Sequence, residues 1–215
     1  KTLFGEVYAP STIGTLLREF TFGHARQLES VLSEHVGALC ERVDLLPGAD
    51  GRVFIDIDSL LRPVYGQAKQ GASYGHTKIA GKQILRKGLS PLVTTISTEH
   101  CAPVITGARL RAGKTNSGKG AARMIAQAVA TARGAGVTGR ILVRGDSAYG
   151  NSSVVTACRR AGARFSLVLT KTAAVVAAIA DINDTAWIPV CYPAAIPTPV
   201  PGSPMPKSPK PDRKS

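Results

Sequence analysis

Two different spacings of hydrophobic residues divide the chain into a helical beginning and a longer mixed region. From Ser11 to Arg42 the apolar residues recur every three or four positions, which puts them on one face of a helix. Ser11 can cap the first turn, and Gly23 predicts a break that makes two helices. Packing on a core is the simpler role for this pair. The end of an N-terminal DNA-binding region, over residues 1–45, is the more specific one.

Apolar and polar residues alternate in the part of the chain that follows. Residues 52–58 alternate in this way and predict a strand that ends in Asp58. Residues 65–81 are polar and rich in glycine, whereas residues 84–98 and 101–110 predict two further strands. Together the three predicted strands indicate an antiparallel meander.

Helical and strand spacings then alternate along the second half of the chain. The predicted order is a helix over 117–135, a strand over 137–144, a helix over 151–161, a strand over 164–170 and a helix over 172–182. An antiparallel start followed by βαβ units indicates an α/β fold with a mixed sheet flanked by helices. We place this core in residues 46–190.

Proline dominates the end of the chain. From Cys191 onward a proline occurs at nearly every second or third position, and the last residues are basic. Proline lacks a backbone N–H and fixes φ, so such a segment forms neither a helix nor a central strand. We therefore expect residues 191–215 to be an extended, disordered basic tail.

The charge of the chain indicates a polyanionic partner. Its 27 Lys and Arg against 14 Asp and Glu give a formal net charge of +13 and a sequence pI near 10.0. This balance favours nucleic acid or an anionic membrane surface, although codon usage in a GC-rich genome would also enrich arginine. No apolar run is long enough to span a membrane, and no signal peptide is visible. The four cysteines form no CxxC pair, which argues against zinc and disulfides and favours a cytoplasmic location.

Aspartates close two of the apolar strands. Asp58 ends the first strand, with Asp56 two residues earlier on the same face, and Asp146 ends the strand Ile-Leu-Val-Arg-Gly-Asp. Carboxylates at the ends of neighbouring central strands suit Mg²⁺, which prefers oxygen ligands and can activate water or a 3′-hydroxyl for phosphodiester chemistry. For either aspartate alone, a turn or a helix N-cap is the alternative role. Asp58 is preferred to Asp56 because it lies nearer the strand end.

Basic residues gather in two segments. Residues 107–115 come close to a phosphate-binding loop, but five residues instead of four separate the glycines, so we predict no NTPase. The basic residues there precede a helix, whose N-terminal N–H groups attract phosphate, and they suit a DNA backbone. The residues that we predict to contact DNA are Lys69, His76, Lys78, Arg109, Arg111, Lys114 and Lys119.

Three segments resemble bacterial insertion-sequence transposases of the DDE type, actinobacterial members above all. They are residues 56–72, 109–115 and 144–150, and the likeness runs from about residue 11 to 190. It implies an RNase H-like (integrase-like) core in which Asp, Asp and Glu hold two divalent ions, Mg²⁺ or Mn²⁺, to nick and join DNA at transposon ends. The resemblance maps Asp58, with Asp56 as the alternate, and Asp146 onto the two metal-binding aspartates. Leu60 stands where the family has threonine.

The third carboxylate of the resemblance has no counterpart in the sequence. In relatives a glutamate lies on a helix well after the strand of Asp146, but here no glutamate follows Glu99. We therefore expect a frameshifted or truncated remnant whose fold is incomplete at the C-terminus. Since two carboxylates hold metal more weakly than three, we expect this chain alone to be inactive or nearly so.

Two other functions stay open at this point. One is a non-catalytic DNA-binding module that occupies transposon ends, as a homodimer or with a full-length transposase that it inhibits. The other is a basic RNA-associated protein, which rests on charge alone. The substitution Asp146→Asn separates an enzyme, which it inactivates, from a DNA-binding module, whose affinity it leaves unchanged or improves.

Overall fold

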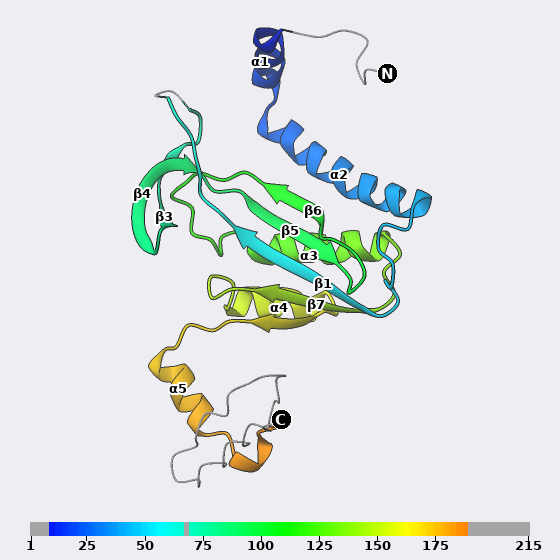
Figure 1. Ribbon diagram of the computed structural model, residues 1–215, viewed down its shortest axis with the longest axis vertical. Helices are drawn as coiled ribbons and strands as arrows, with labels where there is room; N and C mark the ends of the chain where they lie inside the picture. Colours follow the sequence, from blue (N-terminus) through cyan, green and yellow to red (C-terminus); the bar gives the residue numbers. More distant parts are fainter. Residues whose placement is uncertain (1–8, 67–68, 189–215) are drawn as a thin grey trace, which may run out of the picture. The chain divides into compact units, whose positions relative to one another are not determined.

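The computed structural model describes residues 9–66 and 69–188 (Figure 1). The predicted proline-rich tail, residues 191–215, lies outside the described residues. The chain divides into two compact units, Lys1–Thr170 and Lys171–Ser215, and each is described by itself. No helix in the described part of the chain is long and apolar enough to cross a membrane.

The predicted helical pair is confirmed, but its break lies elsewhere. The two helices are α1 (Pro10–Glu19) and α2 (Phe22–Arg42), so the break is at Thr21 and not at Gly23. The Thr21 hydroxyl accepts the backbone N–H of His24 at 3.5 Å, and Nδ1 of His24 accepts the N–H of Thr21 at 3.1 Å. This reciprocal cap fixes the first turn of α2 and outweighs the helix penalty of Gly23, about 1 kcal/mol.

The central sheet has five strands in the order β6-β5-β1-β7-β8 (Figure 1). Strands β1, β5 and β6 are antiparallel neighbours, as the meander predicted, whereas β7 and β8 run parallel to β1. The predicted α/β fold with a mixed sheet is therefore confirmed. The bounds are β1 (Arg52–Ser59), β5 (Leu92–Ser97), β6 (Val104–Arg109), β7 (Arg140–Gly145) and β8 (Arg164–Leu167).

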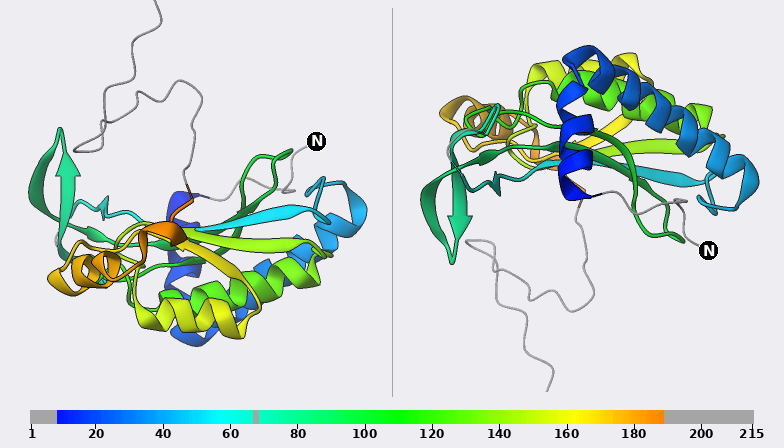
Figure 2. Two further views of the ribbon diagram at one scale, coloured as in Figure 1. Left: turned by 90° about the horizontal axis from the view of Figure 1, so that it is seen from below. Right: turned by 90° about the horizontal axis from the view of Figure 1, so that it is seen from above.

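Helices α3 (Ala121–Gly134) and α4 (Ser152–Arg160) lie together on one face of this sheet (Figure 2). Alternate residues of the central strands point toward that face and form the core with apolar residues of both helices. Val53 and Ile55 of β1 and Val143 of β7 are 0% exposed. The intervening residues of β1 and β7 point to the opposite face of the sheet, where the two aspartates lie.

A second sheet corrects the predicted strand over residues 84–98. Three strands, in the order β2-β4-β3, form a separate sheet. The predicted single strand is in fact two strands of different sheets, divided at Ser90 and Pro91. Pro91 has no N–H for a ladder, and the Arg111 guanidinium donates to the carbonyl of Ser90 at 3.0 Å, which holds the corner. The bounds are β2 (Arg62–Pro63), β3 (Ser73–Ile79) and β4 (Lys82–Leu89).

Strand β3 lies within the polar stretch for which no strand was predicted. It pairs with β4 through a two-residue turn at Ala80 and Gly81, whose φ angles are +48° and +77°. Such positive φ values are typical of tight hairpin turns. The hydrophobic pattern gave no sign of the strand because its sheet buries little: Tyr74 is 62% exposed and Leu85 is 57% exposed.

The second unit contains a short helix, α5 (Ala173–Ala180), and a 3-10 turn, η1 (Asp184–Ala186). The Thr172 hydroxyl accepts the N–H of Val175 at 3.3 Å and caps α5. This helix was predicted over residues 172–182. It buries none of its own residues.

Candidate active site

The register between β1 and β7 places two aspartates side by side. These parallel neighbours pair Asp56 with Arg144 and Ile57 with Gly145. The next residue of the chain is an aspartate in both cases: Asp58 within β1, and Asp146 directly after the end of β7. Paired Cα atoms of adjacent strands lie about 4.8 Å apart. Both aspartates therefore stand at the carboxyl edge of the sheet, on the face opposite α3 and α4.

Both carboxylates are exposed and anchored to nearby backbone. One oxygen of Asp58 accepts the N–H of Ser59 at 2.6 Å, and one oxygen of Asp146 accepts the N–H of Ala148 at 2.9 Å. The Asp146 bond forms the turn that leads from β7 to α4, but the N-cap of α4 is Asn151. The helix-capping alternative for Asp146 therefore does not apply.

Asp56 lies on the same face but is engaged by an arginine. Arg144 donates two hydrogen bonds to its carboxylate, from Nε and from an Nη nitrogen, both at 2.7 Å. The Arg144 guanidinium also stacks over the ring of Phe54, 4.3 Å from its centroid. The hydrogen bond to Asp56 raises the pKa of Arg144 above its ordinary value. Asp56 is thus part of an ion pair, whereas Asp58 and Asp146 form no ion pair with any residue that the structure describes; we call these two the free carboxylates.

Tyr149 links the two carboxylates to the basic loop after β6. Its side chain is 1% exposed, and its hydroxyl has no hydrogen-bond partner of good geometry within the described residues. Burial raises the pKa of the Tyr149 phenol, the charges of Asp58 and Asp146 raise it further, and the Ser59 hydroxyl and Arg111 act in the opposite direction. The phenol therefore senses the charges of both carboxylates and of Arg111.

Two of the predicted DNA-binding arginines make internal contacts. Arg109 donates to the carboxylate of Glu29 at 3.1 and 3.0 Å and to Gln127 at 3.2 Å, which ties the sheet to α2 and α3. Arg111 donates to three backbone carbonyls in the loop at residues 116–119, the shortest at 2.7 Å. Burial lowers the pKa of Arg111. In this structure both arginines shape the loop from inside.

The other predicted DNA-binding residues lie on the surface or in the small sheet. Lys69, His76, Lys114 and Lys119 are exposed, and Lys78 lies in β3. His76 and Lys114 line a groove of about 490 Å³ between the small sheet and the basic loop, and this groove reaches Ser59, the neighbour of Asp58. Lys114 in this lining, close to the segment of Asp58, can contact a phosphodiester strand.

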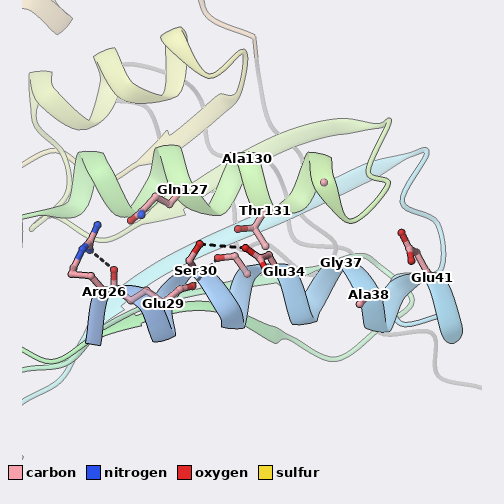
Figure 3. A pocket seen from close by; sticks show the side chains of 12 residues that line it. Arg26, Glu29, Ser30, Glu34, Gly37, Ala38, Glu41, Gln127, Ala130 and Thr131 are labelled. Atoms are coloured by element: carbon pink, nitrogen blue, oxygen red, sulfur yellow. Dashed lines mark hydrogen bonds and ion pairs between the residues drawn. The ribbon is translucent and has the colours of Figure 1, made fainter. Parts of the chain in front are cut away.

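A larger pocket, about 720 Å³, lies between α2 and α3 (Figure 3). Glu29, Glu34 and Glu41 line it together with Arg26, and Arg26 pairs with Glu29. Acidic side chains repel a polyanion, and the pocket does not include either free aspartate. Although this pocket is larger than the groove beside Ser59, it is not the candidate site for phosphodiester chemistry.

Comparison with known protein families assigns the chain to one of them. It matches the family described as Transposase DDE domain group 1 over residues 6–191. The chain belongs to this family. Transposases of this family act in DNA transposition, bind transposon DNA and typically use a divalent metal. Family membership, together with a sheet of three antiparallel and two parallel strands, confirms the RNase H-like core.

Two further comparisons add less about this DDE transposase domain. No curated protein matches it. Among solved structures it is similar to the crystal structure of the Mos1 strand transfer complex, at 13% sequence identity and a TM-score of 0.28. That similarity covers 72% of this chain and 47% of the Mos1 chain, so the domain spans about half the length of that protein.

The carboxylates of this transposase domain fit a divalent cation in part. Asp58 and Asp146 offer oxygen ligands from adjacent strand ends, as hard cations require. Among residues 9–66 and 69–188, no group of three or more His, Cys, Asp or Glu side chains is arranged to hold a metal ion. The third carboxylate that the resemblance implies therefore has no counterpart in the described structure.

The sequence missed two residues of this site. Arg144 and Tyr149 both stand in the segment that carries the family resemblance, but neither was given a role. The pairing of Arg144 with Asp56 follows from the strand register, which the sequence alone does not provide. For Tyr149 the available signal was weak: one aromatic residue three positions after an aspartate.

Proposed function

We propose that this chain is the catalytic core of an insertion-sequence transposase that cleaves phosphodiester bonds and joins strands at transposon ends. One observation carries the proposal: the Ile57–Gly145 register of two parallel strands, which brings Asp58 and Asp146 together on one face. A divalent cation held there, Mg²⁺ or Mn²⁺, would supply Lewis-acid chemistry at phosphorus. We prefer Asp58 to Asp56 as the first ligand because Arg144 engages both oxygens of Asp56.

The residues of the chain then have distinct parts in this function. Strands β1 and β7 hold the two carboxylates at a fixed separation, and their backbone bonds to Ser59 and Ala148 orient one oxygen of each. Arg111 fixes the loop that carries Lys114 and Lys119. Of the residues predicted from the sequence to contact DNA, we assign this role to those that are exposed, above all His76, Lys114 and Lys119. Transposon DNA in the cytoplasm is the proposed partner.

We expect this activity to be impaired in the chain as it stands. A site with two carboxylates binds a cation more weakly and positions water less well than a site with three. The frameshift or truncation that would explain the missing glutamate stays a prediction. Reading the gene region decides it, because a family-like C-terminal half should be encoded in another frame.

The test combines metal binding with DNA cleavage. Electron paramagnetic resonance titration should detect Mn²⁺ bound by the wild-type chain and lost in Asp58→Asn and in Asp146→Asn. Asp56→Asn is the matched control, on the same strand and face, and should bind Mn²⁺ like the wild type. Binding that survives in Asp146→Asn would refute the assignment, and robust strand transfer by the wild-type chain would refute the expected impairment.

A non-catalytic DNA-binding module is the second candidate, as a homodimer or as an inhibitor bound to a full-length transposase. The incomplete carboxylate set in the described residues favours it. This function predicts that Asp146→Asn leaves DNA affinity unchanged or improves it, because a negative charge is removed beside the DNA. Loss of affinity in that variant would argue against this second candidate.

A further inference from the structure

A groove at the amino-terminal ends of the strands carries a concentration of arginine. Its volume is about 690 Å³, and it is bounded by the loops before β1, β7 and β8. Arg52, Arg140 and Arg164 are the first residues of these three strands, and all three line the groove. None of them belongs to the DNA-binding residues predicted from the sequence.

These arginines lack adequate counter-charges. Arg52 and Arg140 are direct partners in the register of β1 and β7, and like charges at such positions destabilise a sheet. Arg52 approaches Glu99 at 3.9 Å, but both side chains are at least 60% exposed, so the pair is weak. Across the described residues no ion pair forms with Arg140 or Arg164. Asp50 is the one acidic residue in the groove lining.

A fourth arginine supports the groove from its wall. Arg133 donates to the backbone carbonyls of Val137 at 2.7 Å and of Gly139 at 2.9 Å. These bonds hold the α3–β7 loop in place beside Arg140. The groove therefore has a braced wall, and Arg52 and Arg140 line it from directly paired positions of adjacent strands.

The groove and the free carboxylates occupy opposite ends of the same two strands. Arg52 precedes Asp58 by six residues, and Arg140 precedes Asp146 by six. An even spacing keeps the side chains on one face, and six residues of strand span about 20 Å. That length corresponds to roughly six base pairs of duplex DNA. One duplex can therefore reach both ends of the sheet along the face that α3 and α4 leave uncovered.

We propose that Arg52, Arg140 and Arg164 form a phosphate-binding site for the backbone of duplex DNA, remote from the site of cleavage. This proposal rests on the proposed function for the position of the cleaved bond, but not for the binding itself. The guanidinium groups bind phosphate oxygens and release counterions from the DNA. They supply affinity without reading sequence.

The test measures the salt dependence of binding to a fluorescein-labelled 20-base-pair DNA duplex by anisotropy. The double variant Arg140→Gln/Arg164→Gln should lower affinity about tenfold near physiological salt and reduce the slope of log K against log[salt] by about 2, because each lost phosphate contact removes about 0.9. Arg140→Lys/Arg164→Lys keeps the charges and should retain most of the slope. Circular dichroism melting checks that each variant is folded.

The matched control is Arg159→Gln/Arg160→Gln, which removes the same charge from exposed residues of α4 that do not line the groove. A change of slope as large in this control as in the groove variant would overturn the proposal, and so would an unchanged slope in the groove variant. A loss seen only with a 20-base-pair RNA duplex would show that the groove serves RNA and would also overturn it.

The two proposals fail in different ways. If Asp146→Asn abolishes Mn²⁺ binding while the groove variant keeps its slope, the carboxylate site stands and the groove site is wrong. If the groove variant loses its slope while no chain binds Mn²⁺, the groove site stands and the catalytic assignment is wrong.

Discussion

Removing Arg144 should break the ion pair that holds Asp56 and so destabilise the centre of the sheet. The variant Arg144→Gln keeps much of the side-chain length but loses the charge and the two hydrogen bonds of 2.7 Å to Asp56. It also loses the cation–π contact with Phe54 at 4.3 Å. Because Arg144 and Asp56 are 44% and 36% exposed, solvent screens the pair and the expected loss is modest.

The magnitude can be apportioned between the two contacts. A bidentate pair of this exposure should give a coupling free energy of about 1 kcal/mol, at the upper end for exposed pairs because its geometry is good. The cation–π contact adds about 0.5 kcal/mol. Arg144→Gln should therefore lower the free energy of unfolding by about 1.5 kcal/mol. A double-mutant cycle with Asp56→Asn should isolate the contribution of the ion pair, about 1 kcal/mol.

Urea denaturation of the wild type, both single variants and the double variant measures this coupling. The coupling should fall by about half between low salt and 1 M KCl, since the pair is partly exposed. Arg140→Gln is the control: it lies on the same strand and face but has no ion pair among the described residues, so its loss should stay below about 0.5 kcal/mol. A coupling below about 0.3 kcal/mol would show that the pair does not hold Asp56.

Three further variants test other parts of the structure. Tyr149→Phe removes a buried hydroxyl that has no hydrogen-bond partner of good geometry among the described residues, and it should raise the free energy of unfolding by about 1 kcal/mol in urea denaturation. Because the folded pKa of this phenol is raised, the wild type should also lose stability as pH rises above about 10, and the variant should lack that loss. Gly139→Ala should lower the free energy of unfolding, measured by urea denaturation, by about 3 kcal/mol or more, because the added Cβ would lie 1.9 Å from a backbone oxygen. Gly134→Ala is the control: its Cβ would meet nothing within 4 Å, so this variant should be as stable as the wild type or more stable. Burial raises the pKa of Glu29, but the hydrogen bond and charge of Arg109 and the charges of other arginines outweigh it and hold that pKa low. The Glu29→Gln variant should therefore be about 1–2 kcal/mol less stable than the wild type at pH 7. That difference should shrink as pH falls below the ordinary pKa of a glutamate, about 4.3, and vanish once pH has passed through the lower folded pKa. An acid-independent difference would show that the Glu29 charge is not responsible.

Local pattern was enough to locate most of the elements of the core. Apolar and polar residues alternate in β1 and β7 because one face of each strand is buried. Apolar residues recur every three or four positions in α2, α3 and α4 because one face of each helix is packed, so both patterns can be recognised in the sequence. The same logic failed where burial is slight. Strand β3 has polar residues on both faces, and β4 ran on into β5 because a single Ser-Pro corner, held by Arg111, divides them.

Three candidate aspartates, Asp56, Asp58 and Asp146, were visible in the sequence because they stand at or near the ends of apolar strands. Which of Asp56 and Asp58 is free could not be seen there. The answer depends on the register of β1 against β7, which sets Arg144 opposite Asp56 and leaves Asp58 beside Asp146. Register is fixed by contacts between strands that lie almost ninety residues apart, and no local pattern encodes it.

The basic residues show the same division. Sequence established the excess of positive charge and hence a polyanionic partner, but it could not say which arginines face solvent. Tertiary packing directs Arg109 toward Glu29 and Arg111 toward loop carbonyls, while it gathers Arg52, Arg140 and Arg164 at one end of the sheet. The physical reason is that an arginine meets its partner or its neighbours across distant segments, and only the folded chain brings those segments together.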